Sequence, residues 1–69
     1  MKYFVIYEKT TTGFSAYVPD LLGCVATGPT LDEVKKLMRE AIEFHLDGMR
    51  EDGTPIPFPS TVAAEEIAV

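Results

Sequence analysis

Apolar side chains recur at intervals of three and four positions over the longest patterned stretch of the chain, from Thr30 to Asp52. This spacing predicts an α-helix, because residues three or four apart lie on the same helical face. The positions on this face are Leu31, Val34, Leu37, Met38, Ala41, Ile42, Phe44, His45, Leu46 and Met49. They span an arc of roughly 200°, which is broader than the stripe of an ordinary surface helix. We therefore expect a sheet over the centre of the arc and a second subunit or a partner over one flank.

Capping residues mark both ends of this helix. Thr30 and Glu33 have the spacing of a capping box, in which each side chain accepts a hydrogen bond from a backbone N–H group at the helix start. Asp32 and Glu33 place negative charge where the helix dipole favours it. Asp52 and Gly53 form the exit, because glycine readily adopts the conformation that ends a helix.

Three shorter stretches before the helix have the character of β-strands. Met1–Lys9 is aromatic, β-branched and apolar on both faces, which favours a strand that is central or covered on both sides. Phe14–Val18 alternates, and Pro19 ends it because proline has no N–H group for the ladder. Cys24–Thr27 is the third predicted strand. The polar loop between the first two strands ends in Gly13, which is free to take a positive φ.

The chain changes character after the helix. Thr54–Pro59 alternates proline with other residues and is predicted to run as a stiff, extended strap. Thr61–Val69 is ambiguous between helix and edge strand, and we favour a strand at Glu65–Val69. The prediction is one domain, residues 1–69, of the α+β class. Its architecture is a two-layer βββα(β) arrangement, an antiparallel sheet with one long helix packed on one face.

The short length limits what the chain can do alone. A 69-residue chain buries only about 60% of its unfolded surface. With one cysteine it forms no internal disulfide, and no clustered metal ligands are visible, so we expect a homo-oligomer, a dimer or larger, without a cofactor. No signal peptide and no run of about 20 apolar residues is present, so we expect a cytoplasmic protein without membrane contact.

The net charge of −5 is concentrated in the second half of the chain. Residues 1–39 carry five Lys or Arg and four acids, whereas residues 40–69 carry one Arg and seven acids. This balance argues against direct nucleic-acid binding, which needs clustered cations. On the helix the acids form a stripe that is either a solvated face or a docking surface for a basic partner. The stripe consists of Glu40, Glu43, Asp47 and Glu51.

No pattern of residues predicts catalysis. Metal-dependent hydrolysis needs converging carboxylates, whereas Glu8 ends the first strand and Asp20 lies in a loop. His45 is interpreted as a core or interface histidine, since no catalytic partner is visible. Cys24 is interpreted as a small buried hydrophobe. Tyr17 and Asp20 serve either to end a strand and turn the chain or as interface groups.

Several motifs occur in register along most of the chain. They are the aromatic first strand, Tyr17-Val18-Pro19-Asp20-Leu21 with Gly23-Cys24, the helix start Thr30-Leu31-x-Glu33, and the exit Glu51-Asp52-Gly53 before Pro55, Pro57 and Pro59. Together they resemble the HicB-like antitoxin family of bacterial toxin–antitoxin systems. Leu22 departs from the family pattern, which often has a second proline there, and we expect it to alter a turn only. The resemblance implies a partial ribonuclease-H-like fold without catalytic activity.

The resemblance also implies a function. Family members bind and silence HicA, a small basic RNA-cleaving toxin, and many carry a C-terminal DNA-binding segment that this sequence, ending at Val69, lacks. We therefore expect a non-catalytic binding module and do not carry over direct repression of an operon from the family. Its predicted partner-binding residues are Tyr17, Asp20, Glu40, Glu43, Asp47 and Glu51. Two alternatives stay open: a nuclease on a degenerate ribonuclease-H-like fold, using Glu8, Asp20 and Mg²⁺, and a dimer that senses a small molecule.

Overall fold

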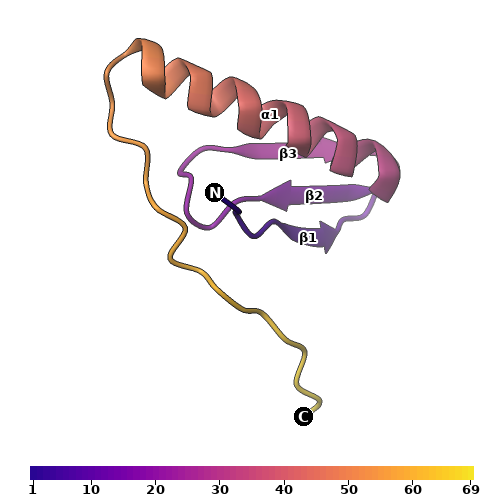
Figure 1. The fold of residues 1–69 in the computed structure, drawn as a ribbon. Helices are drawn as coiled ribbons and strands as arrows, with labels where there is room; N and C mark the ends of the chain where they lie inside the picture. The colour runs from indigo at the N-terminus through magenta and orange to yellow at the C-terminus, as the bar shows by residue number, and fades with distance from the viewer.

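Three short strands and one long helix form the regular structure of residues 1–69, all of which the computed structural model describes. The elements are β1 (Ile6–Lys9), β2 (Phe14–Tyr17), β3 (Val25–Gly28) and α1 (Leu31–Glu51). The strands make an antiparallel sheet in the order β1-β2-β3, and α1 lies across one face of it (Figure 1). The predicted two-layer α+β architecture is confirmed.

β1 and β2 are shorter than the sequence predicts because their pairing stops at Tyr17, whereas β3 has the predicted length but begins and ends one residue later. Ile6, the first residue of β1, lies opposite Tyr17. The chain then turns: the Val18 N–H donates to the Cys24 carbonyl and the Cys24 N–H to the Leu21 carbonyl, each over 3.2 Å. This turn leaves Cys24 outside β3 and the first five residues without a partner on β2. The prediction that the first strand is central is wrong, because β1 is an edge strand.

The register assigns residues to the two faces of the sheet. Two neighbouring cross-strand rows point to opposite faces: Tyr7, Ala16 and Ala26 in one, and Ile6, Tyr17 and Val25 in the other. Ala16 is buried beneath the helix. On the outer face Tyr17 is 40% and Val25 62% exposed, so no second layer of this chain covers that side.

Thr30 caps α1 as predicted. The Glu33 N–H donates to Thr30 Oγ1 over 3.2 Å, although the reciprocal bond of a full capping box is not formed. At the other end the Asp52 N–H donates to the Gly48 carbonyl over 3.0 Å, and Gly53 takes a φ of 69°. The helix therefore begins and ends where the sequence predicts, because both signals are local.

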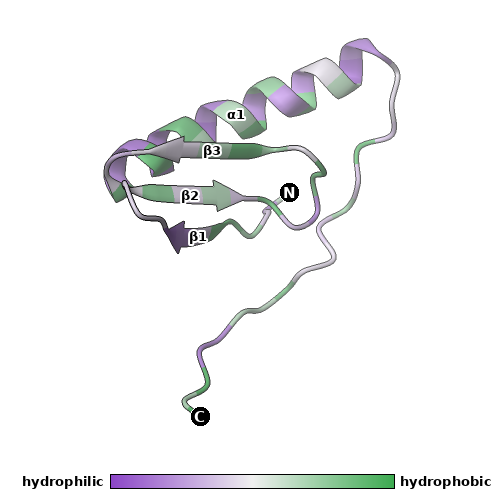
Figure 2. Cartoon of the chain, turned by 180° about the vertical axis from the view of Figure 1, so that it is seen from behind, coloured by the Kyte–Doolittle hydropathy of each residue, from purple (hydrophilic) through white to green (hydrophobic).

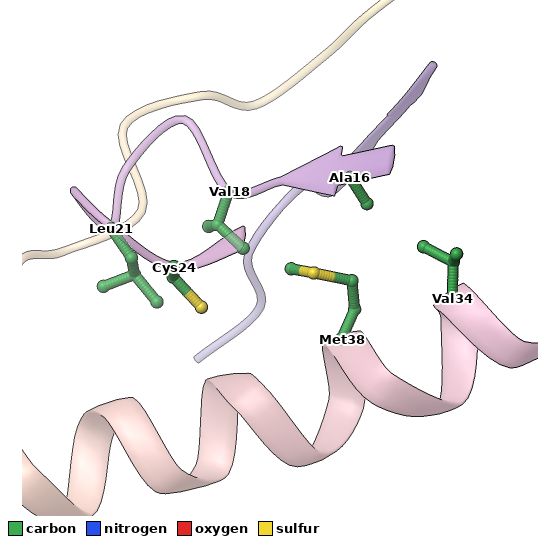
Figure 3. Close-up of a cluster of buried hydrophobic side chains, with 6 residues drawn as sticks. All are labelled: Ala16, Val18, Leu21, Cys24, Val34 and Met38. Atoms are coloured by element: carbon green, nitrogen blue, oxygen red, sulfur yellow. The ribbon is translucent and has the colours of Figure 1, made fainter. Parts of the chain in front are cut away.

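A single small cluster fills the space between the sheet and the helix (Figure 3). Val34 and Met38 project from α1 toward side chains from β2 and from the turn that follows it. The buried residues are Ala16, Val18, Leu21, Cys24, Val34 and Met38. Burial raises the pKa of the Cys24 thiol, as expected for a small buried hydrophobe. Since only 6 of 69 residues are buried, each contributes a large share of the core.

Gly13 has a role that the sequence does not reveal. Positive φ occurs only at Gly23 and Gly53, so Gly13 does not use the positive φ that glycine allows. Instead, the backbone of Gly28 and Pro29, at the junction of β3 and α1, approaches Gly13 so closely that a Cβ atom would lie 2.8 Å from Pro29 Cα. Glycine is needed there because the neighbouring backbone leaves no space for a side chain.

The segment after α1 runs extended past one end of the sheet and then leaves it (Figure 1). Within Thr54–Pro59, the Pro57 carbonyl accepts a hydrogen bond of 2.6 Å from the Tyr3 hydroxyl. The predicted strand at Glu65–Val69 is wrong: this part of the chain has no regular secondary structure. A strand forms only where a neighbour completes its ladder, and no strand lies beside these residues.

Candidate functional site

The four acidic residues predicted to form a stripe are all exposed on α1: Glu40, Glu43, Asp47 and Glu51. One of them is paired, since Arg50 Nη1 lies 2.9 Å from Asp47 Oδ1. Both side chains of this pair are more than half exposed, and such pairs contribute only about 0–1 kcal/mol. Three of the four carboxylates therefore have no ion-pair partner, and a cationic partner can approach them although Lys36 lies beside Glu40 at one end of the stripe.

Exposed apolar side chains lie among these acidic residues. Phe44 is 82% and Leu37 42% exposed. Phe44 is four residues from Glu40 and three from Asp47, so these side chains share one side of α1. The sheet covers only the part of the apolar arc around Val34 and Met38, so the rest of the arc is exposed beside the acids. We name the outward surface the acidic–apolar face; it consists of Leu37, Glu40, Phe44, Asp47 and Glu51, with Glu43 at its margin.

Tyr17 lies in the other layer of the molecule. It occupies the outer face of the sheet between Ile6 and Val25, with the side chain of Phe4 also 37% exposed. The helix covers the opposite face of the sheet (Figure 1). The fold therefore distributes the predicted binding residues over two surfaces and does not gather them into one site.

Asp20 anchors the segment that follows the strap. Its Oδ1 accepts hydrogen bonds from the Ser60 hydroxyl at 2.7 Å and the Thr61 hydroxyl at 3.4 Å, and its Oδ2 accepts one from the Thr61 N–H at 3.1 Å. These bonds, with that from Ser60 the largest contributor, hold the pKa of the Asp20 carboxyl below its ordinary value. No local signal reveals this contact, since the partners are about forty positions apart in sequence. The predicted interface role of Asp20 stays a prediction.

We expect Asp20→Asn to release Ser60 and Thr61 from the turn after β2. A neutral amide has one acceptor oxygen where the carboxylate has two, and charge-assisted bonds are the stronger kind. Because the pKa of Asp20 is lower in the folded state, its stabilisation is complete above the ordinary aspartate pKa of about 3.9. It is lost as the pH falls through the lower folded-state pKa. Urea unfolding at pH values above and below the ordinary aspartate pKa measures the stabilisation by Asp20. The NMR signal of the Thr61 amide shows whether the substitution releases Thr61.

Asp52→Asn is the control for this variant, because it removes the same charge at an exposed position after α1. It is expected to leave the Thr61 amide signal unchanged. If the Thr61 signal and the pH dependence of stability in Asp20→Asn match those of the unsubstituted chain, the carboxylate does not hold Ser60 and Thr61 in place.

No group of three or more His, Cys, Asp or Glu is placed to hold a metal ion. Glu8 lies on β1 and is exposed, whereas the oxygens of Asp20 are engaged by Ser60 and Thr61. His45 is partly exposed on α1, and no hydrogen bond joins its side chain to another residue. The structure thus brings together no residues for the nuclease alternative.

No helix here combines the length and hydropathy that crossing a membrane requires.

The same arrangement of sheet and helix occurs in a solved structure. A chain of the HicA3 and HicB3 toxin–antitoxin complex superposes with a TM-score of 0.75 and 33% sequence identity, over 87% of this chain and 70% of that one. The family model described as HicB-like antitoxin of bacterial toxin–antitoxin systems matches residues 3–68. The chain belongs to the HicB-like antitoxin family.

Relatives occur in a phage, a bacterium and an archaeon. An uncharacterized 14.9 kDa protein of Haemophilus phage HP1 is 42% identical over 57 residues, which cover 83% of this chain and 43% of the phage protein. A UPF0150 protein of Helicobacter pylori is 38% identical over 68% of this chain and 65% of its own length. A UPF0150 protein of Thermoplasma acidophilum is 36% identical over 100% of this chain and 97% of its own length. The chain thus spans less than half of the phage relative and nearly all of the archaeal one.

Proposed function

We propose that this chain is the non-catalytic, protein-binding module of an antitoxin, and that it neutralises a basic, RNA-cleaving toxin of the HicA kind. Membership of the HicB-like antitoxin family supports the antitoxin role, and the similar chain in the HicA3 and HicB3 complex supports a toxin as the partner. The observation that carries the proposal is the acidic–apolar face of α1, where the exposed Phe44 is bordered by Glu40 and Asp47.

This combination suits a protein partner with a positive surface. A large aromatic side chain that becomes buried on binding is a frequent source of affinity. Surrounding charges act mainly on the rate of encounter, because they attract the oppositely charged partner over a distance set by the salt concentration. Phe44 would therefore determine how long the complex lasts, and the acids how quickly it forms.

We also propose that the chain works as a homo-oligomer in the cytoplasm. Its core of six buried residues is small, and the row of Ile6, Tyr17 and Val25 on the outer sheet face has no cover from this chain. A second copy is a common means of stabilising so short a domain.

A purified toxin of the HicA kind provides the direct test. Stoichiometric addition of the chain is expected to suppress RNA cleavage by the toxin. Glu40→Gln with Asp47→Asn is expected to slow association about three- to tenfold at low salt and to flatten its salt dependence, because two attracting charges are removed. Stopped-flow association at several salt concentrations measures both quantities.

Glu8→Lys is a matched control, since it changes the net charge by the same two units on an exposed position of the sheet. It is expected to change the association rate less than the helix variant does. Equal slowing by both variants would remove the acidic–apolar face from the mechanism. RNA cleavage that continues at full rate in excess chain would overturn the antitoxin role.

A further inference from the structure

The helix is offset from the centre of the sheet, so part of the inner sheet face is left open. α1 packs against β3 and β2 but not against β1. Beside β1 this leaves a cleft of about 260 Å³ between sheet and helix. Its walls are apolar except for two cationic side chains, and the lining residues are Val5, Tyr7, Lys35, Met38, Arg39 and Ile42. A ligand that fits this cleft should combine apolar and acidic groups.

The strand that borders this cleft has a free edge. β1 pairs with β2 on one side only, and no backbone hydrogen bond extends from its other side. Unpaired N–H and C=O groups on an exposed edge are a ready template for one more strand. An extended segment lying there would complete the sheet and cover the cleft at the same time.

The chain contains one segment with matching properties, residues 62–69, which we name the arm. The arm is extended and runs away from the sheet in both views (Figures 1 and 2). Its apolar side chains are uncovered: Val62 is 83% and Ile67 73% exposed. In an extended segment, alternate residues share a side, so Glu65, Ile67 and Val69 point the same way. This side of the arm carries one carboxylate and two apolar side chains, which complement the two cations and the apolar walls of the cleft.

We propose that the arm of a second copy of this chain pairs with the edge of β1 and places Glu65, Ile67 and Val69 in the cleft, so that two copies exchange arms. The bonds from Ser60 and Thr61 to Asp20 fix the base of the arm, and beyond them the arm leads away from its own cleft. A mutual exchange is closed by a two-fold axis, which satisfies both arms and both clefts. The inference rests on the proposed homo-oligomer and specifies its contacts.

Two charge-reversed chains test the exchange. Lys35→Glu with Arg39→Glu reverses the charge of the cleft, and Glu65→Lys reverses the charge of the arm that faces it. Each variant alone is expected to raise the Kd of the homodimer at least about tenfold, because attraction between arm and cleft becomes repulsion at both arm–cleft contacts of the dimer. When the two variants are mixed, each cleft meets an arm of opposite charge, so a heterodimer with the original Kd is expected. Sedimentation velocity measures the Kd, native mass spectrometry identifies the heterodimer, and circular dichroism checks that both variants are folded.

A second pair of variants tests the apolar contact without reversing any charge of the cleft. Ile67→Asp is expected to weaken the dimer at least about tenfold, since it places a carboxylate among apolar groups. Val62→Asp introduces the same group on the other side of the arm and is expected to change the Kd less than about threefold. Equal effects of the two substitutions would overturn the proposed register.

Three further outcomes would overturn the exchange. The first is a dimer whose Kd none of the arm and cleft variants changes, which would place the interface elsewhere, for instance on the outer sheet face. The second is a chain that stays monomeric at every concentration. The third is that no heterodimer forms on mixing while NMR shows the arm in contact with the cleft in a monomer. This result would show that the arm folds back on its own chain. None of these outcomes bears on toxin binding, which the inhibition of RNA cleavage tests separately.

Discussion

Met38→Ala is expected to lower the free energy of unfolding by about 2–5 kcal/mol, the usual range for truncating a fully buried methionine. The Met38 side chain is 1% exposed and projects from α1 into the middle of the core (Figure 3). A chain of 69 residues has a total stability of only about 3–10 kcal/mol. The substitution is therefore expected to unfold a measurable fraction of the protein at room temperature, as seen by urea denaturation at a fixed chain concentration.

Phe44→Ala is the control for this substitution, because it removes a larger apolar side chain from an exposed position on the same helix. Its expected effect on unfolding is within about 0.5 kcal/mol, as for most surface substitutions. The same variant is expected to weaken toxin binding. Similar losses of stability in the two variants would mean that α1 does not pack on the sheet through the face described.

Gly13→Ala is expected to destabilise the fold by about 1–3 kcal/mol, the range for inserting an extra methyl group into a packed site. The added Cβ would meet the Gly28 carbonyl and lie 2.8 Å from Pro29 Cα. Both contacts are with backbone, so no side chain can rotate away, and the start of α1 would have to shift against the hairpin. Thermal unfolding followed by circular dichroism measures the loss.

Gly48→Ala introduces the same methyl group in the body of α1, where no atom outside the local helix backbone lies within 4 Å of the added Cβ. Alanine is the better helix former there, so this variant is expected to gain about 0.5–1 kcal/mol. The two substitutions should therefore change stability in opposite directions. A neutral Gly13→Ala would show that the hairpin and the β3–α1 junction are not in close contact.

The two proposed binding surfaces lie on different sides of α1. The cleft is lined by Lys35, Arg39 and Ile42, whereas the acidic–apolar face contains Phe44 and Glu40. At about 100° per residue, Ile42 and Phe44 are separated by roughly 160° around the helix. A toxin on one side and the arm of a second copy on the other would therefore not compete, and a dimer would present two toxin-binding faces.

The helix was predictable residue by residue, because its signals lie within a few positions of one another. Thr30 and Asp52 bound it as expected, and Val34 and Met38 form the centre of its buried face. The exposed position of Phe44 was only partly foreseen. The width of the apolar arc indicated that the sheet would leave one flank of the helix uncovered. Which flank is uncovered depends on the position of the sheet relative to the helix, and this leaves Phe44 exposed.

The contacts of Asp20 and the conformation of Glu65–Val69 depend on residues far apart in the sequence, so the sequence did not reveal them. Asp20 was interpreted either as a turn residue or as an interface group, and neither interpretation included the bonds of its carboxylate to Ser60 and Thr61 about forty positions away. The Glu65–Val69 segment alternates like a strand, but an alternating pattern specifies only the potential to pair. A strand also needs an adjacent edge to pair with, and in this structure the segment lies beside none.

The sequence by itself determined the elements whose causes are local: the capped helix, the three short strands, the strap of spaced prolines and the excess of negative charge in the second half of the chain. Only the tertiary structure decided that β1 is an edge strand, that α1 leaves a cleft beside it, and that the arm extends beyond the fold. The physical reason is that propensity and periodicity act over a few residues. The placement of a helix on a sheet, in contrast, depends on the shapes and volumes of side chains brought together from distant positions in the chain.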